Sequence, residues 1–184
     1  MKKELNFKHI SPYLPYNLKC KYPYGKKEGL VRDIHNLSID EQDIKMSINF
    51  MEGQHIWMFK PLLRPMSDLF NKVQYKGESI TPMERIIRIA TGWYDEGVLS
   101  ISDYKLKSFD DGEAKVGDYT DSLDQTFAIS IKKGDITHIW RDSPYGIMGV
   151  ILRNQQHIAA FLDELHFDWR FNLIEKGLAE PIKS

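Results

Sequence analysis

The sequence has a single cysteine, Cys20, and no long apolar run. One thiol cannot form an intramolecular disulfide or supply a cysteine-based zinc site. No segment approaches the roughly 18 consecutive apolar residues that a membrane span requires. The first residues are basic, but the apolar segment of a signal peptide does not follow them. We therefore expect a soluble, cytoplasmic protein that does not bind membranes, with Cys20 as an inert thiol in a buried strand position.

An excess of charge of either sign is also missing. The chain has 25 basic and 26 acidic side chains, for a net charge of −1. Proteins that grip nucleic-acid backbones non-specifically need a strong positive field, so we do not expect that activity. A local basic patch is compatible with this balance.

Sequence patterns for common chemistry are lacking. No two of the six histidines lie three to five residues apart, and HExxH is absent. The acidic segment 110–124 lacks the ligand order of an EF-hand, and we read it as a solvated loop. Glycine-rich phosphate loops and the Gly-x-Ser-x-Gly elbow do not occur. We predict neither a metal nor a cofactor, and we assign no catalytic residue.

What is present predicts one α+β domain over residues 1–184, with a mostly antiparallel sheet covered by two main helices. The 42% hydrophobic content is ample for one core. Prolines and tyrosines in residues 1–17 indicate an extended arm. Alternation and turn residues predict strands near 18–23, 30–38, 44–50, 55–63 and 93–109. They also predict a turn at Glu52-Gly53-Gln54 and a hairpin from Thr126–Ile131 and Ile136–Trp140.

The helix over 82–91 has the clearest start, because Thr81 can cap it, Pro82 fits its first position and Glu84 completes a capping box. Its predicted apolar stripe is Met83, Ile86, Ile87 and Ala90, and Gly92 is its natural stop. A shorter helix is predicted over 67–73. The last helix is predicted over 154–176, from the spacing of Ile158, Phe161, Leu162, Leu165 and Trp169, with Gly177 as its end.

The segment Lys60-Pro-Leu-Leu-Arg-Pro-Met-Ser-Asp-Leu69 suggests an anion site. Lys60 and Arg64 share one face of a predicted strand, and a helix begins close to Arg64. Arg85 and Arg88 on the next helix could join them, and Trp140 and Arg141 on a later strand have planar side chains that suit stacking on a flat ligand. The candidate ligand-binding residues are therefore Lys60, Arg64, Arg85, Arg88, Trp140 and Arg141. The competing reading is structural, in which Asp68 occupies the helix end and the cations pair with acids on a solvated face.

Two segments resemble a group of small uncharacterised proteins from bacteriophages and prophages of the Bacteroidetes. They are Lys60-Pro-Leu-Leu-Arg-Pro-Met-Ser-Asp-Leu69 and His166-Phe-Asp-Trp-Arg-Phe-Asn-Leu-Ile-Glu-Lys-Gly-Leu-Ala179, behind an early Leu14-Pro-Tyr-Asn-Leu-Lys19. The resemblance covers under a fifth of the chain. It implies a phage-borne protein acting in a bacterial host cytoplasm, and it carries no activity.

Three functions compete at this stage. The first is an accessory protein that acts by binding, either sequestering a small anionic, nucleotide-like ligand or engaging a host protein. The second is a small hydrolase in which His138 or His166 works with a carboxylate such as Asp168. The third is a structural or homo-oligomeric protein that uses exposed tyrosine and tryptophan from the arm and the last helix.

Overall fold

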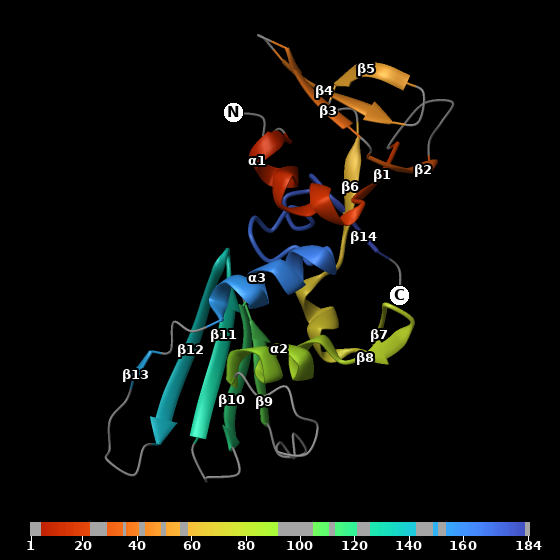
Figure 1. The fold of residues 1–184 in the computed structure, drawn as a ribbon. Helices are drawn as coiled ribbons and strands as arrows, with labels where there is room; N and C mark the ends of the chain where they lie inside the picture. The colour runs from red at the N-terminus through yellow and green to blue at the C-terminus, as the bar shows by residue number, and fades with distance from the viewer. Residues whose placement is uncertain are drawn as a thin grey trace. The chain divides into compact units, whose positions relative to one another are not determined.

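A computed structural model describes residues 5–22, 29–34, 36–40, 43–48, 51–55, 59–91, 105–110, 113–120, 126–142, 149–150 and 154–182. Helices and mostly antiparallel strands confirm the α+β class (Figure 1). The chain divides into two compact units, Met1–Pro65 with Asp163–Ser184, and Met66–Leu162. The expectation of one domain stays a prediction.

The first unit holds two small sheets. Its elements are α1 (Phe7–Ile10), the 3-10 helix η1 (Ser11–Tyr16), β1 (Lys19–Lys21), β2 (Val31–Asp33), β3 (Asn36–Asp40), β4 (Asp43–Ile48), β5 (Met51–His55), β6 (Lys60–Leu63) and β14 (Glu180–Pro181). One sheet has the order β14-β6-β1-β2 and the other the order β3-β4-β5. Only β14 and β6 run parallel among these pairs.

The N-terminal segment differs from the extended arm that we predicted. Residues 7–16 form α1 and η1 instead, and Tyr13 is completely buried. Proline excludes a long helix, but its fixed φ lies within the range of a 3-10 helix, so Pro12 and Pro15 fit η1. The Tyr13 hydroxyl donates to the carbonyl of Phe167, 3.0 Å away, which ties this segment to the C-terminal residues.

The core of the first unit joins the beginning and the end of the chain. Its buried members come from the N-terminal helices, β1, β6 and the C-terminal segment: Leu5, Ile10, Tyr13, Leu18, Cys20, Tyr22, Ile34, Phe59, Leu63, Leu173 and Ala179. Cys20 is fully buried, as predicted, and burial, followed by the charge of Asp33, raises the pKa of its thiol to about 12.

The second unit contains a five-stranded antiparallel sheet with the order β13-β12-β11-β10-β9, in which β9 to β12 lie side by side (Figure 1). Its elements are the 3-10 helix η3 (Met66–Phe70), β7 (Val73–Tyr75), β8 (Glu78–Ile80), α2 (Pro82–Thr91), β9 (Lys105–Asp110), β10 (Glu113–Thr120), β11 (Thr126–Lys132), β12 (Asp135–Asp142), β13 (Gly149–Val150) and most of α3 (Gln155–Glu164).

Two hairpins of this unit turn on the same dipeptide. Lys76 and Gly77 connect β7 to β8, and Lys133 and Gly134 connect β11 to β12. Positive φ at both central residues of each turn matches the type I′ geometry that suits two-residue hairpins. The β11–β12 hairpin was predicted. The β7–β8 hairpin was not, because we expected a helix over 67–73; the helix there is the shorter η3.

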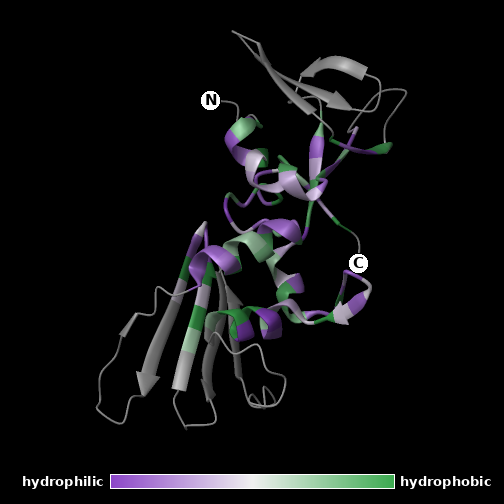
Figure 2. Ribbon diagram, viewed as in Figure 1, coloured by the Kyte–Doolittle hydropathy of each residue, from purple (hydrophilic) through white to green (hydrophobic). Residues whose placement is uncertain are grey.

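Helix α2 follows the prediction closely. It begins at Pro82 and ends at Thr91, and the stripe Met83, Ile86, Ile87 and Ala90 is buried. Figure 2 shows hydrophobic and hydrophilic residues alternating along its ribbon. The predicted stop at Gly92 lies outside the described residues.

Two other predictions were wrong. Segment 110–124 is not a continuous loop, because Glu113–Thr120 forms β10, which pairs with both β9 and β11. The predicted turn at Glu52-Gly53-Gln54 lies instead inside β5. In each case cross-strand pairing outweighs the weak strand propensity of acidic residues and glycine.

The last helix is shorter than the predicted 154–176, because α3 ends at Glu164. His166 has φ +59, a left-handed conformation that a helix does not continue through. The following residues form turns, and Gly177 closes the last of them with φ +70. There the amides of Gly177 and Leu178 donate to the carbonyls of Ile174 and Leu173, the pattern of a Schellman motif.

Candidate anion-binding site

Strand β6 presents two cations on one face. Pro61 and Leu63 are buried, whereas Lys60, Leu62 and Arg64 are half-buried, which is the alternation of a strand with one covered face. Lys60 and Arg64 lie four residues apart, about 13 Å by strand geometry. This shared face was predicted from the sequence.

The neighbouring strand β1 adds a third free cation to this face. Lys21 lies opposite Lys60 and Cys20 lies opposite Pro61 in an antiparallel register. One further step in this register places Lys19 opposite Leu62. It is then a diagonal neighbour of both Lys60 and Arg64, and such diagonals span about 7–8 Å between backbones. Lys19, Lys60 and Arg64 therefore surround Leu62, and we call these three residues the cationic face.

Carboxylates near this face leave those three cations unneutralised. Glu180 lies beside Leu62 in the parallel register with β6, but its Oε2 pairs with the Lys21 Nζ, 2.6 Å away. Asp33 lies opposite Lys19 on β2 without forming an ion pair with it. Within the described part of the chain, Lys19, Lys60 and Arg64 have no carboxylate partner at ion-pair distance. This face thus has four cations and two acids. Among the described residues, only Glu180 forms an ion pair, with Lys21.

Arg64 is the least satisfied member of the face. Its backbone is fully used, since its amide donates to the carbonyl of His166 at 2.8 Å and its carbonyl accepts from the amide of Asp168 at 2.9 Å. Its side-chain Nε is buried without a hydrogen-bond partner. A guanidinium stays charged at any physiological pH. A buried donor of this kind costs about 1–3 kcal/mol unless an acceptor meets it.

His166 lies next to Arg64 through this backbone pairing. Its Nε2 is 2.9 Å from the carbonyl of Tyr16. A carbonyl only accepts, so Nε2 carries the hydrogen, and in the neutral ring Nδ1 holds the lone pair. Burial is the main cause that lowers the pKa of His166, and the positive charges of Arg64 and Lys19 lower it further. The ring is therefore mostly neutral at pH 7.

The possible catalytic pair of His166 and Asp168 is not assembled. The Oδ2 of Asp168 accepts from the amide of Ile174 at 2.7 Å, and its Oδ1 is buried without a partner. Burial raises the pKa of Asp168 despite that hydrogen bond. His166 instead bonds Tyr16, and no hydrogen bond joins the two side chains in the described residues. A general base oriented by a carboxylate is thus not formed here.

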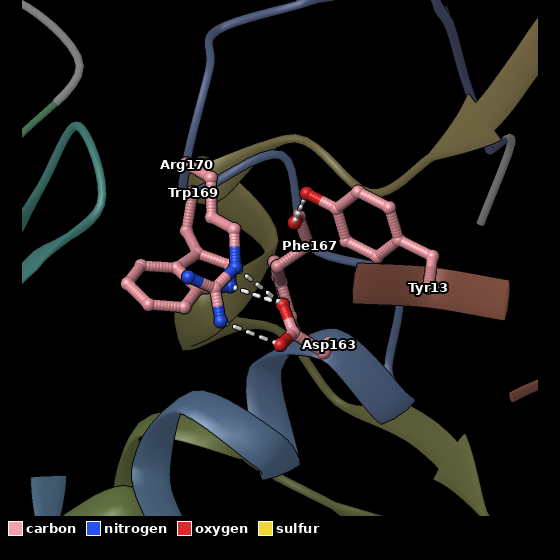
Figure 3. Close-up of polar contacts among 5 residues, drawn as sticks. All are labelled: Tyr13, Asp163, Phe167, Trp169 and Arg170. Atoms are coloured by element: carbon pink, nitrogen blue, oxygen red, sulfur yellow. Dashed lines mark hydrogen bonds and ion pairs between the residues drawn. The ribbon is translucent and has the colours of Figure 1, made fainter. Parts of the chain in front are cut away.

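A second polar group holds the shape of the 163–170 turn and does not suggest chemistry. Asp163 Oδ1 accepts from the indole Nε1 of Trp169 at 2.8 Å, and both of its oxygens accept from Arg170 (Figure 3). The Arg170 guanidinium also lies 4.1 Å from the centre of the Trp169 ring. Every charge in this group has its counter-charge, so its role is structural. Trp169 and Tyr13 are buried, which removes them from the exposed aromatics expected to make a subunit contact.

The other predicted site residues belong to the second unit. Arg85 is exposed on α2, and Arg88, one turn on, is half-buried. Trp140 pairs with Phe127 across β12 and β11, and Arg141 is the additional residue where their register shifts. The structure therefore places Lys60 and Arg64 in one unit and the other four in another.

The helix end predicted beside Arg64 does not support an anion site. The element that follows is η3, a 3-10 helix of only five residues. Asp68 within it is buried and accepts from the Asn71 side chain at 3.1 Å. Asp68 is thus engaged by Asn71, and no hydrogen bond from a helix-end amide to its carboxylate occurs among the described residues.

Lys19 and His166 were missed as members of the site. The alternation in Leu18-Lys-Cys-Lys-Tyr22 already put Lys19 and Lys21 on one face of a strand, although we used it only for Cys20. No sequence signal paired that strand with Lys60. His166 was weighed only as a catalytic base, since its approach to Arg64 depends on a bridge between residues about a hundred positions apart.

No protein-family model, curated protein or solved structure matches this chain. Among the described residues there is no cluster of three or more histidine, cysteine or acidic side chains able to hold a metal ion. In that same part of the chain, no helix has the length and apolarity to cross a membrane.

Proposed function

We propose that this protein is a phage-encoded accessory protein that sequesters a small anionic, nucleotide-like ligand on the cationic face of Lys19, Lys60 and Arg64. The observation that carries the proposal is the Arg64 side chain. Its guanidinium is charged at physiological pH and its Nε is buried without a hydrogen-bond partner. Lys19 and Lys60, on the same face, have no carboxylate partner among the residues that the structure describes. An anionic oxygen supplies the acceptor that this group lacks.

The chemistry of the three cations favours phosphate or carboxylate groups. An arginine fork meets two oxygens of such a group at once, whereas lysine acts as a point charge that adapts to the remaining ones. The resemblance to phage proteins supports an accessory role inside a bacterial cell. The hydrolase alternative loses its His166–Asp168 pair, because these two side chains each bond to other groups, and its His138 version stays a prediction.

Calorimetry and thermal shift with a panel of nucleotides, inorganic phosphate, sulfate and dicarboxylates test the proposal. A ligand at 100 times its Kd stabilises the folded state by about 2.7 kcal/mol. Removing one charged hydrogen-bond donor costs about 1.5–3 kcal/mol, so Arg64→Gln is expected to weaken binding about 10- to 100-fold. Lys19→Gln and Lys60→Gln should weaken it by smaller factors.

Two control variants make the result specific. Lys8→Gln removes an exposed charge on α1, which belongs to the same unit but to neither β1 nor β6, and should leave affinity unchanged. Arg85→Gln tests the helix residues that the sequence first suggested. Loss of binding in Arg85→Gln but not in Arg64→Gln would move the site to the second unit. No response to any anion in the panel would end the proposal.

A further inference from the structure

We infer that His166 is a fourth binding group of this site, and that it takes up a proton when a tetrahedral dianion such as a phosphate monoester binds. This inference rests on the proposed anion site and adds to it the ligand class and a coupling to pH. It makes His166 a binding residue where the sequence suggested a general base.

The geometry of His166 leaves one ring nitrogen available. The Tyr16 carbonyl holds Nε2–H at 2.9 Å, and the ring is further fixed by an edge contact with Tyr13, 6.4 Å between centres. The His166 carbonyl accepts from the amide of Arg64 at 2.8 Å, so the backbones of the two residues lie side by side. Nδ1 has no partner among the residues that the structure describes. It is therefore the atom that accepts a proton.

Burial and the charged groups around the ring determine the pH at which His166 takes up this proton. Arg64 at the end of β6 and Lys19 on β1 oppose a further positive charge, and so does burial. Asp163 from α3 favours it, as does the bond to the Tyr16 carbonyl in η1. In the free protein the opposing influences prevail. A bound dianion adds two negative charges beside Arg64 and Lys19, which reverses the local field.

A dianion fits this arrangement better than a monocarboxylate does. Three permanent cations surround Leu62, and two of them already repel a proton from His166. A single negative charge leaves an excess of positive charge, so it gives little reason for the ring to protonate. A phosphate monoester offers two charges and three terminal oxygens, enough for the Arg64 fork, a lysine and the imidazolium N–H. Binding and protonation are then mutually reinforcing, as linkage requires.

Sulfate is the probe that isolates the protein's own titration. Phosphate loses charge near pH 6, but sulfate stays divalent across the pH range in which histidine titrates. Sulfate affinity is measured by calorimetry between about pH 7.5 and 5.5, in buffers of differing ionisation enthalpy that reveal proton uptake on binding. NMR of the imidazole nitrogens follows the titration of His166 in the wild-type protein. We expect sulfate to bind more tightly at the lower pH, by a factor of up to about ten for each unit by which it raises the pKa of His166.

The variants separate this inference from the proposed site. His166→Gln keeps a donor for the Tyr16 carbonyl but has no group that titrates in this range, so its sulfate affinity should no longer rise between pH 7.5 and 5.5. His9→Gln removes the other described half-buried histidine of the unit and should keep the increase. Sulfate binding through Arg64 without proton uptake, or an unchanged His166 NMR titration on saturation, would overturn the role of His166 alone. An absence of sulfate and phosphate binding at both pH values would overturn the site as well.

Discussion

The amide of Arg64 donates to the carbonyl of His166 at 2.8 Å, and this hydrogen bond brings a strand end and a C-terminal turn together. The amide of Asp168 completes the pairing by donating to the Arg64 carbonyl at 2.9 Å. The two residues that we consider most important for ligand binding are therefore joined to each other through the backbone. Substituting either side chain leaves this pairing available, which makes both positions suitable for mutagenesis.

Stability should depend on pH through His166. Its folded-state pKa is lowered from the ordinary 6.5, mainly by burial, so the unfolded chain binds the proton more readily. Its contribution to stability is complete above pH 6.5 and is lost as pH falls through that value toward the folded pKa. We expect the free energy of unfolding in urea to decrease between about pH 7.5 and 5.5 in buffers free of sulfate and phosphate.

Variants and neighbouring groups sharpen this expectation. His9 also has a lowered pKa, mainly through burial, so His9→Gln and His166→Gln should each reduce the slope in part. Asp168 acts with the opposite sign, because its raised folded-state pKa makes the fold gain stability as pH falls toward that pKa. An identical pH slope in the wild type and in both histidine variants would contradict the assignment.

Asp163 should be the most sensitive polar residue of the first unit. It is buried and accepts from both Trp169 and Arg170 (Figure 3). Asp163→Asn removes the counter-charge of Arg170 and one acceptor oxygen. Because Arg170 is partly exposed, we expect a loss of about 2–3 kcal/mol in urea unfolding, below the full cost of breaking a buried pair. Glu78→Gln on the exposed β7–β8 hairpin is the control and should change stability by less than about 0.5 kcal/mol.

Local signals predicted the elements whose ends and faces are encoded within a few residues. Helix α2 has its proline at the first position and a buried stripe at helical spacing, and the β11–β12 hairpin has a turn dipeptide between alternating segments. The prediction of the last helix was wrong at its end. Leu165 and Trp169 are buried, as their spacing indicated, but they lie in turns that follow α3 and not in the helix. Apolar spacing reports burial, and it does not reveal the left-handed residue at 166 that ends the helix.

For the candidate site, too, the sequence predicted only what depends on neighbouring residues. Lys60 and Arg64 share a face because a strand alternates, and that holds in any fold. Lys19 joins them only through the register of β1 with β6, and His166 only through the bridge between Arg64 and Phe167. Pairings over such sequence separations leave no local pattern. Grouping Arg85 and Arg88 with Lys60 assumed that their helix packs near the strand of Lys60, and charge alone does not determine such packing.

Gly77 should be required by its backbone conformation alone. Its φ is +87, and a Cβ placed there meets no atom within 4 Å, so strain rather than collision sets the cost of substitution. We expect Gly77→Ala to destabilise the protein by about 1–2 kcal/mol, the cost of a left-handed conformation for an L-residue. Gly77→Asn should cost less, since asparagine tolerates that region. Equal thermal stability of the alanine and asparagine variants would show that φ is not the determinant.

Cys20 should resist alkylation in the folded protein. It is fully buried in β1, so the alkylating reagent cannot reach it. The pKa of its thiol is raised to about 12, so the fraction of reactive thiolate is very small near neutral pH. Iodoacetamide labelling followed by mass spectrometry should be slow in native buffer and rapid in concentrated urea. Ser79→Cys supplies the matched control, because position 79 is exposed on β8 and its thiol should react quickly without denaturant. Fast native labelling at Cys20 would mean that the sheet of β1 and β6, and with it the cationic face, opens readily in solution.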